Sequence, residues 1–491
     1  MEQFSLENFR KFDSFPPIKF GGVTFLIGEN NAGKSSIVKS IILSQQNLQP
    51  LFTYNGDESL HPMFSFDVEQ LHIGTYERAV CNRSSSEYFT FHVDERYNFN
   101  YTFAIARPKT GTDHTQAPIA FVELVWGQEM CSLKFDFEAR KIIIKAAPRT
   151  EVQIEELSQK ILERRAAIEH GVPAIRKERM ESFISEMQKI VENPHGGEAI
   201  IDMPPKMVDL EGIHYYPAVI PYLFAYTFGH YPYAGKSDDN KTFISNYTYI
   251  FKTPGLLYDP DYFSNAYIYS HGASQNVLYR YEDKNDYTAQ SVHNYMKEGI
   301  KKGTKAEQFV TTWMRKFKIG QDFKINSIYG DSYTLVITDA SGKEMPLADK
   351  GIGSIQVMSL LLRLAVLIKK GSGDGKIILI EEPEQNLHPT LQGQLAQLLY
   401  EINKTYGYQV IVETHSEYLV RMSQVLVAQI SQDNNCKNQD ELDKINPFRI
   451  HYLPADSTHY EIKYQINGSL GRPFGKGFYD VADDLALRLM L

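Results

Sequence analysis

The chain contains two kinds of hydrophobic pattern that predict different strands. Over residues 71–145, several short segments alternate between apolar and polar residues, as strands do when only one face is buried. We therefore expect an antiparallel sheet there. The runs Val23–Ile27, Ile377–Ile380 and Val410–Val412 are apolar without interruption, which is typical of strands buried on both faces. From Leu347 onward helical and strand patterns alternate, which predicts an α/β core.

The middle of the chain follows neither pattern. Residues 151–192 are charged and keep a helical spacing of apolar residues around a Gly-Val-Pro break. This predicts a helical hairpin, which either projects from the protein or packs on its core. Residues 213–287 are rich in tyrosine and in loop-forming residues, with little periodicity. They are either a partner-binding insertion or an irregular region packed around its own aromatic side chains.

Composition narrows the class of protein. The chain has 491 residues, of which 43% are hydrophobic and 23% charged, as in a soluble globular protein with two or three structural units. A net charge of −9 argues against non-specific nucleic-acid binding by the whole surface, although a local basic groove stays open. The three cysteines are widely spaced, which excludes a disulfide framework and a cysteine zinc site and favours the cytoplasm. The N-terminal residues do not predict a signal peptide, and we expect the apolar stretch at 358–368 to be too short to span a bilayer.

A glycine-rich segment after the first apolar run predicts a nucleotide site. Residues 28–35 fit the pattern G-x-x-x-x-G-K-S, between a predicted strand and a predicted helix. Glycines let backbone N–H groups turn toward phosphate oxygens, and the helix directs its positive end at the same anion. Lys34 is expected to reach the β- and γ-phosphates, and the Ser35 hydroxyl to bind Mg²⁺. The residues expected to contact ATP here are Gly28, Asn30, Asn31, Ala32, Gly33, Lys34, Ser35 and Ser36.

Two later apolar runs end in polar residues that suit the other half of such a site. Glu381 and Glu382 follow the run at 377–380, and we expect Glu381 to hold Mg²⁺ and Glu382 to activate the attacking water. His415 follows the run at 410–412 and is expected to contact the γ-phosphate or the water. The alternative for His415 is an ordinary histidine at the end of a strand.

A second anion-binding helix start precedes the carboxylates. Lys350, Gly351, Gly353 and Ser354 lie where a long apolar helix is predicted to begin. One chain does not need two such sites for one nucleotide, but a pair of chains does. The sequence therefore predicts a head-to-tail dimer in which these residues cap the γ-phosphate held by the other copy.

Together these motifs resemble the ABC-type ATPase heads of the RecF/SMC-like group, and especially the stand-alone OLD-like ATPases. The resemblance rests on Leu6–Phe12, on the glycine-rich loop, on Ile377–Pro389 and on Thr414–Ser416. It implies an α/β head with a mixed sheet core and an antiparallel β subdomain, into which the predicted helical hairpin and the tyrosine-rich region are inserted. It also implies ATP hydrolysis with Mg²⁺, and it adds Arg10 to the residues expected to bind ATP. Combined with the patterns along the chain, it predicts an N-terminal ATPase lobe (1–147), a hairpin insertion (148–210), a tyrosine-rich insertion (211–290) and a C-terminal ATPase lobe (291–491).

Some features depart from the larger group. The signature at 349–356 reads D-K-G-I-G-S-I-Q in place of the transporter-type L-S-G-G-Q, and only residues 151–192 resemble a coiled coil. OLD proteins proper carry a TOPRIM nuclease after the ATPase, whereas about 75 residues follow His415 here, without a Glu and D-x-D cluster.

These features lead to a ranked set of functions. The resemblance favours a cytoplasmic ATPase that dimerises on ATP and regulates a separate effector, a toxin or nuclease, in anti-phage defence. The alternative is a RecF-like DNA-binding ATPase of repair or recombination. A third hypothesis is a non-enzymatic scaffold, in which bound nucleotide serves only to hold the assembly together.

Overall fold

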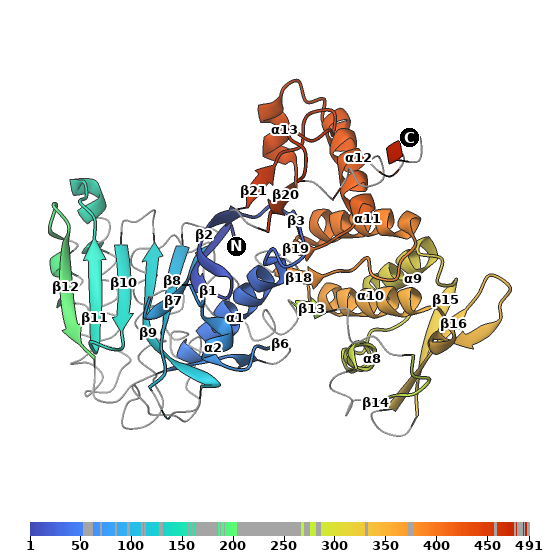
Figure 1. Ribbon diagram of the computed structural model, residues 1–491, viewed down its shortest axis with the longest axis horizontal. Coiled ribbons are helices and arrows are strands. Elements are labelled where there is room, and N and C mark those ends of the chain that lie inside the picture. Colours follow the sequence, from blue (N-terminus) through green and yellow to red (C-terminus); the bar gives the residue numbers. More distant parts are fainter. Residues whose placement is uncertain are drawn as a thin grey trace. The chain divides into compact units, whose positions relative to one another are not determined.

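A computed structural model describes two compact units of the chain (Figure 1). It describes residues 1–52, most of 62–162, most of 185–203, residues 267–269, and 275–475 apart from 281–285, 329–331, 372–376 and 456–458. Most of the predicted helical hairpin and nearly all of the tyrosine-rich region lie outside the described residues. Unit 1 comprises Met1–Lys19 and Lys39–Phe263, and unit 2 comprises Phe20–Val38 and Ser264–Leu491.

Unit 1 is built on an antiparallel sheet, which confirms the sheet predicted from alternation. The strand order is β12-β11-β10-β9-β8-β7-β1-β2, with β4 paired to β9. Alternate residues of these strands point into an aromatic core that includes Phe64, Phe89 and Phe91. Its elements are β1 (Gln3–Phe9), β2 (Phe12–Lys19), β4 (Met63–Ser65), β5 (Asp67–Val68), β6 (Leu71–His72), α2 (Tyr76–Ala79), β7 (Tyr88–Glu95), β8 (Phe99–Ala106), β9 (Gln116–Trp126), β10 (Cys131–Asp136), β11 (Lys141–Ala146) and β12 (Gly197–Asp202).

Unit 2 is built on a mostly parallel sheet with the order β13-β18-β19-β3-β20-β21. Every residue of β3, β18 and β19 is buried, as the unbroken apolar runs predict. β19 lies between β3 and β18 and is parallel to both, so the carboxyl ends of all three strands meet at one edge. The strands are β3 (Val23–Gly28), β13 (Tyr267–Tyr269), β18 (Ile377–Glu381), β19 (Gln409–Glu413), β20 (Phe448–Leu453) and β21 (Tyr460–Ile462).

Helices and a small second sheet complete unit 2. α10 packs against α8 and α9, and α11 packs against α12 (Figure 1). The elements are α8 (Tyr287–Lys297), α9 (Lys305–Lys316), η2 (Leu347–Asp349), α10 (Ile352–Lys370), α11 (Pro389–Tyr406), α12 (Glu417–Asp433), α13 (Gln439–Ile445), and the strands β14 (Tyr279–Arg280), β15 (Asp322–Ser327), β16 (Ser332–Thr338) and β17 (Glu344–Pro346). α1 (Lys34–Phe52) begins in unit 2 and continues into the residues of unit 1.

The apolar helix α10 is longer than the stretch at 358–368 considered above, because residues 352–357 and 369–370 also belong to it. With 19 residues and a mean hydropathy of 1.7, it has the length and composition that could cross a membrane. In the structure, 72% of the most apolar 18-residue segment of this helix is buried inside the protein. The helix supplies a large part of the core of unit 2.

Candidate functional site

The glycine-rich loop requires glycine for two local reasons. Gly28 ends β3, and a Cβ atom built on it would lie 2.1 Å from the carbonyl oxygen of Leu453 on the neighbouring strand β20. Gly33 has a φ of 99°, a left-handed conformation that glycine adopts without steric cost. Asn30 and Asn31 between them are exposed, whereas Ala32 is buried. The loop therefore passes close along β20 and then turns into α1.

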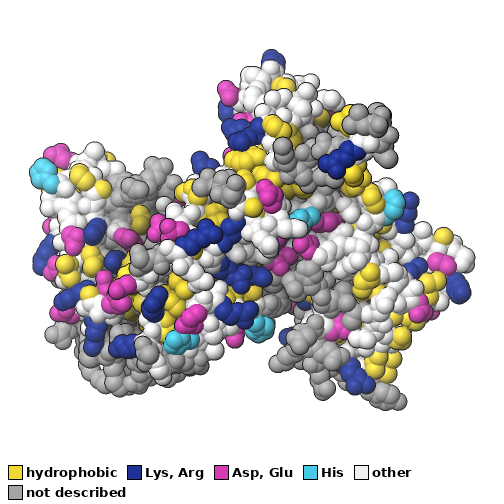
Figure 2. Space-filling model, viewed as in Figure 1, with side chains coloured by type: hydrophobic (Ala, Val, Ile, Leu, Met, Phe, Trp, Pro, Cys, Tyr) yellow, Lys and Arg dark blue, Asp and Glu magenta, His cyan; other side chains and the backbone are white. Residues whose placement is uncertain are grey.

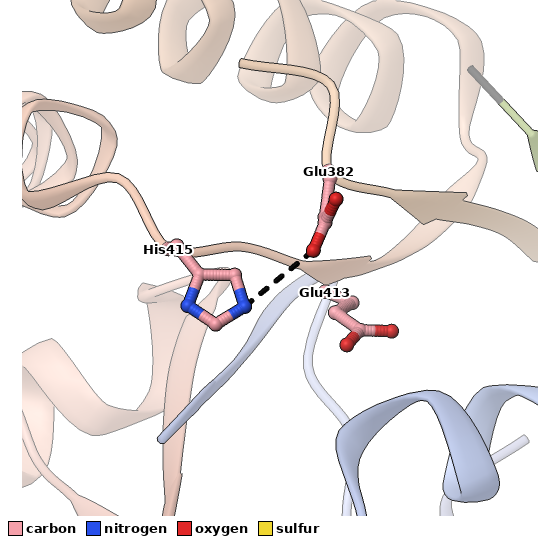
Figure 3. A group of neighbouring side chains, drawn as sticks. All are labelled: Glu382, Glu413 and His415. Carbon is pink, nitrogen blue, oxygen red and sulfur yellow. Dashed lines mark ion pairs between the residues drawn. The ribbon is translucent and has the colours of Figure 1, made fainter. Parts of the chain in front are cut away.

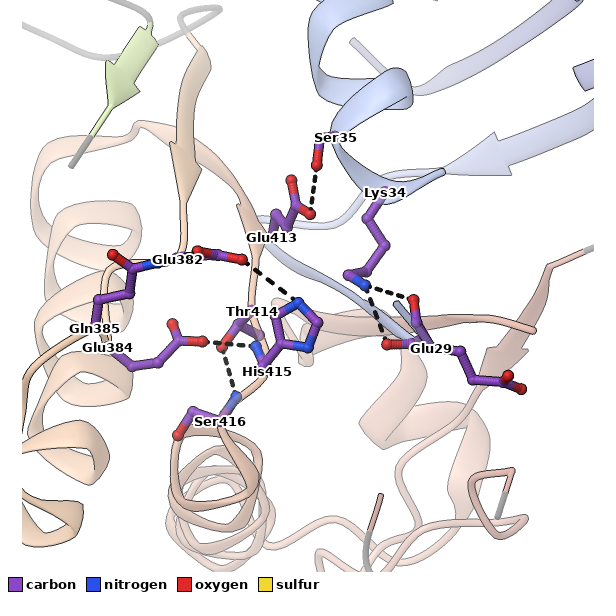
Figure 4. Close-up of polar contacts among 11 residues, drawn as sticks. Glu29, Lys34, Ser35, Glu382, Glu384, Gln385, Glu413, Thr414, His415 and Ser416 are labelled. Atoms are coloured by element: carbon purple, nitrogen blue, oxygen red, sulfur yellow. Dashed lines mark hydrogen bonds and ion pairs between the residues drawn. The ribbon is translucent and has the colours of Figure 1, made fainter. Parts of the chain in front are cut away.

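The first two residues of α1 direct their polar atoms at different partners (Figure 4). Lys34 is buried, and its Nζ donates hydrogen bonds to the carbonyls of Gly28 (3.1 Å) and Glu29 (2.9 Å). Ser35 Oγ donates a hydrogen bond of 2.8 Å to Oε1 of Glu413. The ammonium of Lys34 thus lies over its own loop, and the hydroxyl of Ser35 faces an acidic strand end.

Glu413 is a site residue that the sequence analysis did not select. It ends β19, and in the sheet register it pairs with Glu381 on one side and with Leu26 on the other. The carboxylate next to Ser35 is therefore that of Glu413, while Glu381 ends the strand one position further from β3. An available signal was the acidic residue that closes the apolar run at 410–412. Glu413 is 378 residues away from Ser35 in the chain, so no sequence pattern indicates that the two side chains are in contact.

Glu382 and His415 come together just beyond the same strand ends (Figure 3). Glu382 has a φ of 46°, and its backbone N–H donates to the carbonyl of Glu413 at 2.8 Å. Its Oε1 lies 3.5 Å from Nε2 of His415, and its Oε2 accepts a hydrogen bond from Gln385. The side chains of His415 and Glu382 are 39% and 25% exposed, so solvent reaches both. The structure thus brings together the two residues that the sequence analysis selected as catalytic.

Glu384 connects the loop after β18 to the residues after β19. Its Oε1 accepts a 2.6 Å hydrogen bond from the backbone N–H of His415. Burial raises the pKa of Glu384. Ser416, which follows His415 in the chain, caps α12: its Oγ accepts a hydrogen bond from the N–H of Leu419 at 3.0 Å. The position of His415 is therefore determined by Glu384 on one side and by the start of a helix on the other.

Burial and the neighbouring charges set the protonation of this group. Burial, followed by the charge of Glu381, raises the pKa of Glu413 to about 7, although the hydrogen bond from Ser35 and the charge of Lys34 oppose the shift. Burial and the charge of Lys34 lower the pKa of His415, against the opposing effect of Glu382. The imidazole is therefore neutral at pH 7, and its ring has a nitrogen that can accept a proton.

The predicted signature lies at the N-terminus of α10 and packs on the loop that follows Glu382. A Cβ atom on Gly353 would lie 2.4 Å from the carbonyl oxygen of Asn386, and Asn386 Nδ2 donates to Gln356 at 3.1 Å. Gly351 is the N-cap residue of α10, and among the described residues no heavy atom outside its chain neighbours lies within 4 Å of a Cβ built on it. Gly353 thus has a packing reason within its own chain, whereas no described side chain packs on Gly351.

The remaining predicted residues have simple surroundings. Lys350 and Ser354 flank the two glycines and are partly exposed, and the N–H of Ser354 donates to the carbonyl of Gly351 at 2.9 Å. Ser36 is buried in the first turn of α1. Arg10 lies in the turn between β1 and β2, and its N–H donates to the carbonyl of Ala79 at 2.6 Å. Arg10 belongs to unit 1, whereas every other predicted site residue belongs to unit 2.

Comparison with known proteins points to an ATPase. Residues 239–420 match the family model described as AAA ATPase domain, which spans less than half of the chain. The match includes Glu381, Glu382 and His415 and begins well after the glycine-rich loop. No curated protein sequence matches the chain.

Three solved structures of SMC head domains show low similarity to this chain in sequence and in structure. The SMC head domain from Thermotoga maritima is 11% identical with a TM-score of 0.34, covering 94% of this chain and 98% of that one. The Smc head domain with an extended coiled coil from Pyrococcus furiosus, bound to the C-terminal domain of ScpA, is 11% identical with a TM-score of 0.33, covering 100% and 99%. The Smc head domain with a coiled coil and joint from Pyrococcus yayanosii is 10% identical with a TM-score of 0.34, covering 95% and 97%.

The family match identifies an ATPase-type domain in the part of the chain that holds the paired glutamates and His415. The sheet of unit 2 joins the glycine-rich loop to that part.

Proposed function

We propose that this chain binds and hydrolyses ATP with Mg²⁺ as an ABC-type ATPase. The observation that supports this most directly is the meeting of three strand ends at one sheet edge. There the hydroxyl of Ser35 bonds to Glu413, and Glu382 lies 3.5 Å from His415. A phosphate loop on one strand and a carboxylate–imidazole pair on the neighbouring strands are what phosphoryl transfer to water needs.

The loop residues suit nucleotide binding. The N–H groups of the loop and of the first turn of α1 would donate hydrogen bonds to the phosphate oxygens at the positive end of the helix. Lys34 would exchange its bonds to the carbonyls of Gly28 and Glu29 for phosphate oxygens. Ser35, with Glu413 and Glu381, offers the oxygen ligands that Mg²⁺ prefers. When bound, the metal ion neutralises charge on the transferred phosphoryl group.

Glu382 is placed to act as the general base. It would take a proton from a water molecule as the water oxygen bonds to the γ-phosphorus and the bond to the leaving oxygen of ADP breaks. Gln385 donates to one carboxylate oxygen, and the other lies on the side of His415, where the water would bind. The neutral His415 would orient that water and the γ-phosphate.

The test is the substitution Glu382→Gln. It should lower ATP turnover by about 10²- to 10⁴-fold, the usual contribution of a positioned base, while nucleotide binding persists. A matched control is Glu417→Gln, which removes an acid on α12 whose partner is Arg421 in the next turn. Equal turnover in Glu382→Gln and wild type would contradict the assignment.

The N-terminus of α10 is our proposed contact between two copies. Gly351 is exposed and provides no side-chain cap for α10, and the N–H groups at such a helix start can bind an anion. We propose that Lys350, Gly351, Gly353 and Ser354 approach the ATP of a second chain in a head-to-tail dimer. In light scattering after size exclusion, Glu382→Gln should dimerise with ATP and be monomeric without it. A monomer under both conditions would contradict the dimer.

The purpose of this ATPase is proposed from the resemblance to OLD-like ATPases. We propose that ATP-driven dimerisation in the cytoplasm regulates a separate effector, a toxin or nuclease, in anti-phage defence. No nuclease motif stands out in the sequence, which supports a separate effector. Co-purification from cells, with and without ATP, tests for such a partner. Recovery of the chain alone under both conditions would contradict it.

The RecF-like alternative requires a basic surface for DNA. On the face drawn in Figure 2, Lys and Arg side chains are interspersed with Asp and Glu over unit 1. Together with the net charge of −9, this favours the effector proposal. ATP-dependent DNA binding with a steep loss of affinity at higher salt would reverse that preference.

A further inference from the structure

Glu382, Glu413 and His415 form a compact group of metal-ligating side chains (Figure 3). Each offers one ligand atom, and these atoms all lie within 4.8 Å of one another. The group is held by the sheet, because β18 and β19 are parallel neighbours and the N–H of Glu382 bonds to the carbonyl of Glu413. His415 follows two residues later and is fixed through Glu384. The distances between the three side chains are therefore set by backbone hydrogen bonds within the sheet and the loops that follow it.

The environment of Glu413 adds a second observation. Glu413 is 4% exposed, and its Oε1 accepts from Ser35. Its Oε2 is buried and has no hydrogen-bond partner among the described residues. A buried carboxylate oxygen without a donor is costly unless a cation or a proton compensates it. The carboxylates of Glu381 and Glu382 add negative charge around it.

We propose that Glu382, Glu413 and His415 bind a divalent transition-metal ion, and that the protein takes up this ion without nucleotide. Two carboxylates and one imidazole suit Mn²⁺, Fe²⁺, Co²⁺ or Zn²⁺, whereas Mg²⁺ favours an all-oxygen shell. Glu382 and His415 are partly exposed, so water can fill the other coordination positions and the ion has a path to enter. Glu413 borders both this site and the Ser35 hydroxyl (Figure 4).

The consequence for ATP hydrolysis rests on the proposed function. A transition-metal ion at this site engages the carboxylate assigned as general base and the imidazole assigned to the water. Bound metal therefore inhibits turnover, and a chelator followed by Mg²⁺ restores it. The same three residues then serve two states, one catalytic and one metal-inhibited.

Metal binding is measured first, without nucleotide. The full chain is treated with chelator, returned to millimolar Mg²⁺, and titrated with Mn²⁺ while free Mn²⁺ is followed by electron paramagnetic resonance. We expect one Mn²⁺ per chain in wild type. Affinity should fall by about 10- to 100-fold in Glu413→Gln and in His415→Ala. Glu413→Gln is nearly isosteric and can still accept from Ser35, so its thermal melt checks that the protein is folded.

Two controls separate the metal site from the nucleotide site. Lys34→Ala should lose ATP binding and keep Mn²⁺ binding, and Glu417→Gln should keep both. Absence of Mn²⁺ binding in the nucleotide-free wild type, or undiminished binding in both Glu413→Gln and His415→Ala, would overturn the proposal. If Mn²⁺ binds as expected but the wild type does not hydrolyse ATP, the proposed function fails and the metal site stands.

The inhibitory role is tested next, in wild type. MgATP turnover is followed as Mn²⁺ or Zn²⁺ is added, and it should fall in proportion to the occupied fraction measured above. Turnover that is unchanged at full occupancy would overturn the inhibitory role.

Discussion

The packing of Gly353 against the loop after Glu382 gives a quantitative prediction for Gly353→Ala. The added methyl group would lie 2.4 Å from the Asn386 carbonyl oxygen and 3.0 Å from Leu387 Cδ2. Cβ atoms do not approach a heavy atom closer than 3.0 Å, so either the helix or the loop must shift by about 0.6 Å. The loop is the segment that carries Glu382, so this displacement reaches the proposed general base.

Two opposing effects set the magnitude. Replacing glycine by alanine in a helix is favourable by ~0.5–1 kcal/mol, since the unfolded chain loses freedom. Overpacking against a backbone carbonyl costs ~1–3 kcal/mol. We expect a net loss of ~1 kcal/mol in the free energy of unfolding, which lowers the Tm of unit 2 by about 2–4 °C. ATP turnover should also fall.

Gly351→Ser is the matched control in the same helix start. In the part of the chain that the structure describes, no heavy atom outside the chain neighbours of Gly351 lies within 4 Å of a Cβ built on it, and serine is a favoured N-cap residue. Differential scanning fluorimetry should show an unchanged or slightly raised Tm, and nucleotide binding by the single chain should persist. If this helix start contacts the ATP of a second copy, the substitution weakens ATP-dependent dimerisation only.

The outcomes separate packing within one chain from contact between two chains. A Tm for Gly353→Ala equal to or above that of wild type would refute the packing argument. A Tm loss in Gly351→Ser as large as that in Gly353→Ala would show that the space at Gly351 is not open.

Two further predictions concern buried polar groups. Glu384→Ala removes the acceptor of the His415 N–H and should cost ~1–3 kcal/mol of stability and lower ATP turnover, whereas Glu384→Gln keeps an acceptor and should retain both; equal loss in the two variants would contradict this role. Burial and the neighbouring His451 lower the pKa of His459 to about 4, so this residue stabilises the fold above pH 6.5 and that contribution is lost as the pH falls from 6.5 toward 4. In thermal melts, the Tm difference between pH 7.5 and pH 5 should therefore be smaller in His459→Asn than in wild type, and an unchanged difference would contradict the pKa assignment.

Local patterns in the sequence were sufficient for the elements of the site. Unbroken apolar runs predicted the buried strands β3, β18 and β19, and alternation predicted the antiparallel sheet of unit 1. These predictions succeed because a strand buried on one face alternates apolar and polar residues, whereas a strand buried on both faces is apolar throughout. The loop motif likewise places Gly28, Lys34 and Ser35 in a segment of eight residues whose conformation depends mainly on glycine.

The order of the strands could not be predicted in the same way. Only the folded sheet shows that β19 lies between β3 and β18, and this puts Glu413 at the hydroxyl of Ser35 and Glu381 one strand away. The same order brings Glu382 to His415. Which strands become neighbours depends on side-chain packing between residues that are hundreds of positions apart. A local sequence pattern carries no information about such packing.

The sequence by itself therefore determined which residues are candidates for the proposed nucleotide site, because strand ends and glycine turns are local features. The tertiary structure decided which of them meet. It made Glu413 the partner of Ser35, gave Gly353 a packing role within its own chain and left Gly351 open. The physical reason is that propensity acts between near neighbours in the chain, whereas contact between strand ends depends on how the whole core packs.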